Sequence, residues 1–105
     1  MIDSNNILTE IKRTVTKDYP DAMIILYGSR ARGDYRMDSD WDLLILLNQD
    51  RITNDIEESI TNPLYDLEID YGQVISPMIY SIKDWNNIYS ITPFFKNVMR
   101  EGKSI

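Results

Sequence analysis

Two apolar segments on either side of a short polar stretch constrain the fold of this chain more than any other feature. Residues 23–27 and 41–47 are almost entirely apolar. Continuous apolar runs of this length are typical of strands that are covered on both faces. A sheet that contains such strands needs helices packed over it. The sequence therefore predicts an α/β fold, a small mixed β-sheet with helices packed mainly on one face.

The polar stretch between these two segments carries the candidate chemistry. Gly28 and Ser29 directly follow the first strand, and Asp40 and Asp42 lie at the start of the second. Side chains alternate between the faces of a strand, so the two aspartates point the same way. Two neighbouring carboxylates repel each other, and a hard cation such as Mg²⁺ removes that cost. A Gly-Ser turn suits phosphate, so the pattern predicts a site for Mg²⁺ and a nucleotide.

This arrangement resembles the nucleotidyltransferase superfamily that includes DNA polymerase β. Ten residues, 30–39, separate Ser29 from Asp40, and the family signature places a spacer of about this length between Gly-Ser and Asp-x-Asp. The Gly-Ser-Arg-Ala-Arg-Gly form, followed by Ser-Asp-x-Asp-Leu, is most similar to the minimal, antitoxin-like nucleotidyltransferases of prokaryotes. These are small single-domain proteins, often encoded beside a helical partner. The match is dense over residues 22–47 and looser as far as Gly102.

The resemblance implies roles for individual residues. Gly28 and Ser29 correspond to the turn that binds the β- and γ-phosphates, and Asp40 and Asp42 to the ligands of two Mg²⁺ ions. It implies transfer of a nucleoside monophosphate from a nucleoside triphosphate, with ATP as the default, to an acceptor hydroxyl. One candidate acceptor is a tyrosine on a helical, toxin-like partner. Arg30 and Arg32, two residues apart on a short helix, do not share a face, and Arg30 is favoured as the residue that faces the nucleotide.

The resemblance also implies a third catalytic carboxylate on the neighbouring strand, and the sequence offers several candidates for it. Asp66, Glu68 and Asp70 alternate with apolar residues over 66–71, which is typical of a strand with one solvated face. Asp70 is favoured as the third metal ligand and catalytic residue, with Glu68 second. Another register places the third position near Ser76, which has no carboxylate. In that register the site is degenerate or is completed in a different way.

Capping signals and periodicity predict the other elements. Four apolar residues between positions 7 and 15 share one helical face. Later helices are indicated by hydroxyl or amide side chains at the N-cap position and by glycine or proline near the helix end. The expected boundaries are Pro20 as the end of the first helix, Asn54 and Pro63 as the limits of another, an extended segment over 74–80, helix starts at Ser81 and Thr92, and a helix end at Gly102.

Composition narrows the class of protein. The chain has 105 residues, which fits a single nucleotidyltransferase domain over 1–105. Its net charge of −6 argues against an extensive nucleic-acid surface, which needs a basic face. Without cysteine or histidine, any metal must be held by oxygen. No apolar run approaches the ~20 residues of a membrane span, so a cytoplasmic protein without membrane contact is expected.

Two other functions remain open on the sequence alone. A degenerate module that binds a nucleotide or a partner without catalysis is favoured if no third carboxylate reaches Asp42. Modification of a small molecule, as in aminoglycoside-modifying relatives, needs an additional substrate domain. An acceptor pocket is therefore expected from a helical partner protein or from a homo-oligomer. Four aromatic residues are candidates for stacking on a base, for the core or for an interface: Tyr80, Trp85, Phe94 and Phe95.

Overall fold

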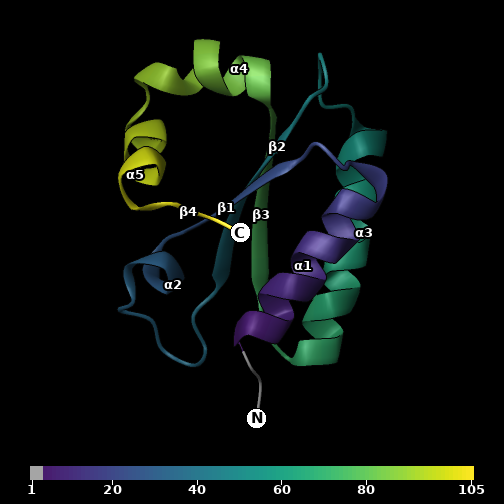
Figure 1. Cartoon of the computed structure of the whole chain (residues 1–105), viewed down its shortest axis with the longest axis vertical. Coiled ribbons are helices and arrows are strands. Elements are labelled where there is room, and N and C mark those ends of the chain that lie inside the picture. The colour runs from purple at the N-terminus through teal and green to yellow at the C-terminus, as the bar shows by residue number, and fades with distance from the viewer. Residues whose placement is uncertain (1–3) are drawn as a thin grey trace.

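A four-stranded mixed sheet lies at the centre of the computed structural model, which describes residues 4–105 and the side chains from residue 6 onward (Figure 1). The strand order is β3-β2-β1-β4. β2 and β3 are parallel, whereas β1 is antiparallel to both β2 and β4. The predicted small mixed sheet is therefore confirmed. The strands are β1 (Met23–Tyr27), β2 (Trp41–Leu47), β3 (Ile75–Ser81) and β4 (Lys103–Ser104).

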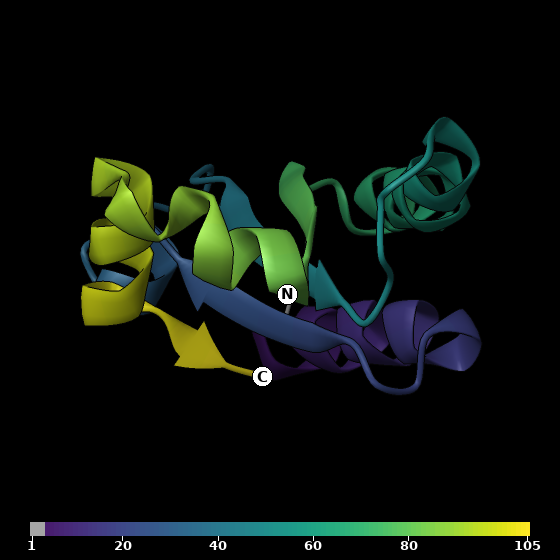
Figure 2. The ribbon, with the colours of Figure 1, turned by 90° about the horizontal axis from the view of Figure 1, so that it is seen from above.

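Helices lie on both sides of the sheet. The two longest, α1 and α3, pack side by side on one face, and the shorter α4, η1 and α5 lie over the other face (Figures 1 and 2). Within the described residues, no helix is long and apolar enough to cross a membrane. The helices are α1 (Ser4–Asp18), α2 (Ser29–Arg32), α3 (Asn54–Tyr71), α4 (Ile82–Asn87), η1 (Tyr89–Ile91) and α5 (Pro93–Glu101).

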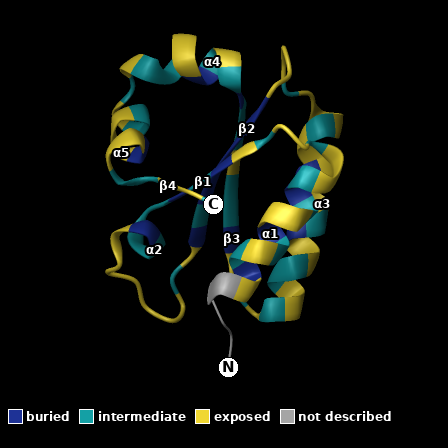
Figure 3. Cartoon of the chain, viewed as in Figure 1, coloured by how far each residue is buried: buried dark blue, intermediate teal, exposed yellow. Residues whose placement is uncertain are grey.

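The strand β2 separates two hydrophobic clusters. Leu43, Ile45 and Leu47 pack with α1 and α3, while Leu44 and Leu46 pack with the residues of α4 and α5. All five side chains are buried, which Figure 3 shows as a dark strand through the centre of the molecule. This is the strand with both faces covered that the apolar run predicts. Asp42 has the same parity as Leu44 and therefore lies on the α4–α5 side of the sheet.

The predicted helix boundaries after β3 are confirmed by their capping hydrogen bonds. Ser81 Oγ accepts a hydrogen bond from Asp84 N at 3.0 Å, at the start of α4. Thr92 Oγ1 accepts one from Phe95 N at 3.1 Å, at the start of α5. Such caps satisfy backbone N–H groups that have no partner within the helix. Gly102 is the C-cap of α5, as expected.

The prediction of a strand over 66–71 is wrong, because α3 continues through Pro63 to Tyr71. Its apolar side chains recur every three or four residues on the face that packs against the core, which is the period of a helix. Ile69, which an alternating strand would bury, is 66% exposed. Burial of the helical stripe outweighs the hydrogen bond lost at Pro63. The residues of the stripe are Ile56, Ile60, Leu64, Leu67 and Tyr71.

Candidate active site

The end of the sheet where β1 stops and β2 begins brings the Gly-Ser turn against the aspartate pair. Tyr27, the last residue of β1, pairs with Asp42 of β2. Gly28 follows with φ 76° and ψ −159°, a conformation that is essentially restricted to glycine. A Cβ at Gly28 would overlap Asp42 Oδ2 and would lie only 3.2 Å from the carboxyl carbon of Asp42. The chain therefore needs glycine here both for its backbone angles and for the close approach of a carboxylate.

The environment of Asp42 makes its negative charge costly. Burial raises the pKa of the Asp42 carboxyl above its ordinary value, and the nearby charges of Asp40 and Glu101 raise it further, while Arg32 lowers it. Burial, followed by Asp42 and Tyr80, also raises the pKa of the Tyr27 phenol to about 12. Tyr27 is therefore neutral at physiological pH. Among the described residues, no arginine or lysine forms an ion pair with Asp40 or Asp42.

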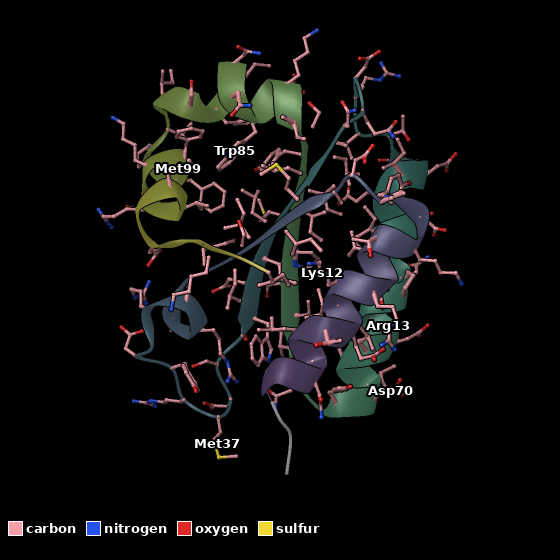
Figure 4. All side chains as sticks on the ribbon, in the orientation of Figure 1. Lys12, Arg13, Met37, Asp70, Trp85 and Met99 are labelled. Atoms are coloured by element: carbon pink, nitrogen blue, oxygen red, sulfur yellow. The ribbon has the colours of Figure 1, made fainter. Side chains whose placement is uncertain are left out.

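Ser76 occupies the position beside the aspartate pair on the neighbouring strand. In the parallel β2–β3 pairing Ser76 is opposite Asp42, and its hydroxyl donates a hydrogen bond to Asp40 Oδ2 at 3.3 Å. This is the register in which the third position has no carboxylate. The favoured candidates lie on α3 instead: Glu68 Oε1 accepts a hydrogen bond from Ile75 N at 2.7 Å, and Asp70 is on the last turn of the helix (Figure 4).

The expectation that Asp70 joins Asp40 and Asp42 from an adjacent strand is therefore not met by the fold, because residues 66–71 are helical. Over the part of the chain that the structure describes, no group of three acidic side chains is placed to hold a metal ion. The physical reason is the continuation of α3, which carries Asp66 and Asp70 away from the sheet. Glu68 instead satisfies the backbone at the start of β3.

Arg30, predicted to face the nucleotide, holds the loop that leads into β2. Its guanidinium lies over the rings of Tyr35 and Trp41, with Cζ 4.6 and 4.2 Å from the ring centroids. It also donates to the carbonyl oxygens of Met37 and Ser39 at 3.1 Å each. Cation–π contacts and backbone hydrogen bonds on one side chain favour a structural role. In this structure Arg30 therefore stabilises the loop before β2 and does not face an open site.

Arg32 is the other arginine of the motif, and it lies on the side of α2 that faces α5. Its guanidinium pairs with Glu101 Oε2 at 2.8 Å and with Asp34 Oδ2 at 3.3 Å. About half of the Arg32 side chain is exposed, and its charge acts on Asp42. Arg32 is thus the motif arginine whose charge acts on Asp42. The sequence spacing predicts only that Arg30 and Arg32 diverge, and the choice between them depends on the loop.

The aromatic candidates for base stacking pack on one another. Trp85 is buried, and its ring contacts those of Tyr80, Phe94 and Phe95 at centroid distances of 5.8, 5.7 and 4.9 Å. They form the cluster between the sheet and the helices α4 and α5, where Figure 4 shows Trp85. Their role in this structure is to hold α5 over β1.

The donor set fits one divalent cation better than two. The carboxylates of Asp40 and Asp42, which have no ion-pair partner among the described residues, provide charge and oxygen for a hard ion at the start of β2. The pKa of Asp42 is raised, so its negative charge favours such an ion. Mg²⁺ is usually held by one or two carboxylates together with water and substrate phosphates. The described residues match that demand at Asp40 and Asp42. A second ion with its own carboxylate on β3 has no support, because Ser76 is at that position.

Comparison with known proteins identifies the family of the chain. Residues 8–98 match the model of the nucleotidyltransferase domain family. A protein of Methanocaldococcus jannaschii named "Putative protein adenylyltransferase MJ0141" is 38% identical over 77 residues, which are 70% of this chain and 76% of the relative. A second protein of that organism, with the corresponding name and the suffix MJ0604, is 35% identical over 80 residues, 76% of this chain and 73% of the relative.

Solved structures share the fold at lower identity. A toxin–antitoxin crystal structure with AMP-PNP has a TM-score of 0.64 and 17% identity, over 97% of this chain and 72% of that one. A variant of the MntA-HpeT toxin–antitoxin has a TM-score of 0.60 and 18% identity, over 100% and 72%. The turn, the aspartate pair and the family match point to one conclusion: the chain belongs to the nucleotidyltransferase domain family and is an enzyme of that class.

Proposed function

We propose that this chain is a divalent-metal-dependent adenylyltransferase that moves AMP from ATP to a hydroxyl group of a partner protein. The observation that carries the proposal is the contact between the Gly28 turn and the Asp42 carboxylate at the end of the sheet. Adenosine is favoured because two relatives are named protein adenylyltransferases. A protein acceptor is favoured by the same names and by the toxin–antitoxin titles of the neighbouring structures.

Each side chain of the site has a distinct task in this proposal. Asp40 and Asp42 would hold the divalent ion, with Mg²⁺ as the ion that such oxygens prefer. When bound, the ion supplies positive charge at the phosphate that is attacked. The Gly28 backbone and Ser29 would receive the terminal phosphates, because no side chain at Gly28 blocks the approach. Arg32 would pair with the phosphate chain, since Arg30 is committed to the loop.

The reaction joins the acceptor oxygen to the α-phosphorus while the bond from that phosphorus to the bridging oxygen breaks. Pyrophosphate leaves, and the acceptor hydroxyl loses its proton. Positioning the acceptor oxygen within roughly 3–3.5 Å of the phosphorus, in line with the leaving group, and stabilising the charge of the transition state both contribute to the rate. The partner protein is proposed to provide the acceptor hydroxyl and the wall that positions it.

Ser76 favours a second candidate, a module that binds a nucleotide without transferring it. The absence of a carboxylate opposite Asp42 removes one group that could help to hold a second ion or to take the acceptor proton. The two candidates make the same prediction for nucleotide binding and differ only in transfer. An experiment must therefore measure both.

The test uses the purified chain, a co-expressed candidate helical partner protein and ATP labelled in either the α- or the γ-phosphate. With Mg²⁺, the partner should retain the α label and not the γ label. Asp42→Asn should abolish labelling, whereas the matched variant Asp70→Asn, on the exposed last turn of α3, should label as the wild type does. Metal-dependent nucleotide binding without labelling would select the binding module. Efficient labelling of an aminoglycoside by the chain alone would refute the partner proposal.

A further inference from the structure

Glu101 reaches the candidate site from the far end of the chain. It is the last residue of α5, and the following Gly102 sits so close to β1 that a Cβ there would lie 2.6 Å from Ile25 Cγ2. Lys103 then pairs with Leu26 in the β1–β4 ladder. The last turn of α5 is therefore fixed over β1, just before the Gly28 turn.

The carboxylate of Glu101 is held between α5 and α2. Its side chain is only 14% exposed, and Oε2 lies 2.8 Å from Arg32 Nη1, across 69 residues of sequence. Burial without a partner would be costly for this carboxylate, so Arg32 compensates for its charge. Both Glu101 and Arg32 also act electrostatically on Asp42, with opposite signs. The ion pair is thus within electrostatic range of the proposed metal-binding carboxylate.

We propose that Glu101 competes with the nucleotide for Arg32. The Glu101 carboxylate holds the Arg32 guanidinium until a nucleoside triphosphate displaces the carboxylate. The proposal rests on the proposed function, and it adds a positioning residue that lies outside the sequence motif. A triphosphate offers several anionic oxygens where Glu101 offers one carboxylate, and guanidinium groups bind phosphate in a bidentate manner. Arg30 cannot substitute, because its hydrogen bonds hold the loop before β2.

The alternative is a static clip, in which the same ion pair only ties α2 to α5. The two roles predict opposite effects on nucleotide affinity. If Glu101 competes, removing its charge frees Arg32 and tightens binding. If the pair is a clip, the same change loosens the end of α5 over β1 and weakens binding or leaves it unchanged.

The experiment measures the affinity of the whole chain for α,β-methylene-ATP with Mg²⁺ by isothermal titration calorimetry. Glu101→Gln, which keeps the side-chain size, should bind about two- to fivefold tighter, the range expected when a partly solvated ion pair no longer competes. Arg32→Gln should bind more weakly. In the Arg32→Gln background, Glu101→Gln should have no effect, because no competition remains. Asp34→Asn is the matched control, since Asp34 also pairs with Arg32 but is 64% exposed, and its effect should be smaller.

Unchanged or weaker binding by Glu101→Gln would overturn the proposal and leave a clip. Equal tightening in the Arg32→Gln background would also overturn it, because simple repulsion of the phosphates by Glu101 would then be sufficient. If Glu101→Gln does not fold, Glu101→Asp takes its place, because it keeps the charge but shortens the side chain and should also tighten binding. An unchanged affinity of Glu101→Asp would then overturn the proposal. Failure of the wild type to bind the analogue at all would refute the proposed function itself, and with it this inference.

Discussion

Replacement of Gly28 by alanine tests whether the turn and the aspartate pair form one structural unit. Two costs add at this position. The backbone angles of Gly28 lie in a region that costs other residues about 1–3 kcal/mol. The new Cβ would also overlap Asp42 Oδ2, and forcing extra volume into a packed site costs about 1–3 kcal/mol more. Gly28→Ala should therefore lower the free energy of unfolding by about 3–4 kcal/mol, a large part of the total of a small domain.

The chain offers matched controls for each cost. Gly33 and Gly72 also have positive φ, 92° and 63°, but a Cβ at either would meet nothing within 4 Å. Alanine at Gly33 or Gly72 should cost only the backbone contribution of about 1–2 kcal/mol. In the Asp42→Ala background, Gly28→Ala should cost less by about 1–2 kcal/mol, because the overlapping carboxylate is gone. In the Asp42→Asn background, which retains the side-chain volume, that relief should be absent.

Urea unfolding curves of these variants without metal provide the measurement, with the slope monitored to confirm that the change is in stability. The reasoning would be refuted if Gly28→Ala cost no more than Gly72→Ala. It would also be refuted if Gly28→Ala and Asp42→Ala were additive to within about 0.5 kcal/mol, since independent sites behave in that way. Either result would mean that the carboxylate is not pressed against the turn.

The remaining predictions concern the charge of the aspartate pair. The pKa of Asp42 is raised above 3.8 in the folded chain, so its ionisation costs stability as the pH rises from below that value through the raised value. Asp42→Asn should therefore be more stable than the metal-free wild type at neutral pH but not at a pH well below 3.8. If the urea midpoints of Asp42→Asn and the wild type differed by the same amount at every pH in this range, the prediction would be contradicted. Ser76→Asp should place a third carboxylate beside Asp42, tighten Mn²⁺ binding at least severalfold and lower metal-free stability; titration with Mn²⁺ and a thermal melt should show both changes.

The sequence predicts an element correctly where interactions between neighbouring residues determine it. Ser81 and Thr92 predict helix starts because a hydroxyl that accepts from a backbone N–H three residues on is a short-range interaction. The two buried strands are predicted by continuous apolar runs, and the shared face of Asp40 and Asp42 follows from strand alternation. These elements place the turn and the aspartate pair without any long-range information.

The predictions from the sequence are wrong where contacts between residues far apart in the chain determine the structure. Pro63 is a local stop signal, but α3 passes through it because its apolar stripe packs against α1 and the sheet. Arg30 and Arg32 are equivalent as a local pattern, and only the rings of Tyr35 and Trp41 assign Arg30 to the loop. The approach of Glu101 to α2 depends on α5 and β4 docking on β1. A signal for α3 was present, because the apolar residues of 56–71 recur at helical spacing on one face.

The balance of charge around Asp42 connects Ser76 and Glu101 to the proposed chemistry of the site. A third carboxylate on β3 would add a negative charge directly beside two that already lack an ion-pair partner among the described residues. Ser76 avoids that cost and uses its hydroxyl to satisfy Asp40 instead. Glu101, an acidic residue near the site, is paired with Arg32. In the proposed function, a triphosphate would bind with one divalent cation, whose positive charge would compensate for the two aspartates, and it would also pair with Arg32. The charges of the proposed site therefore suit a metal–nucleotide complex better than a free anion.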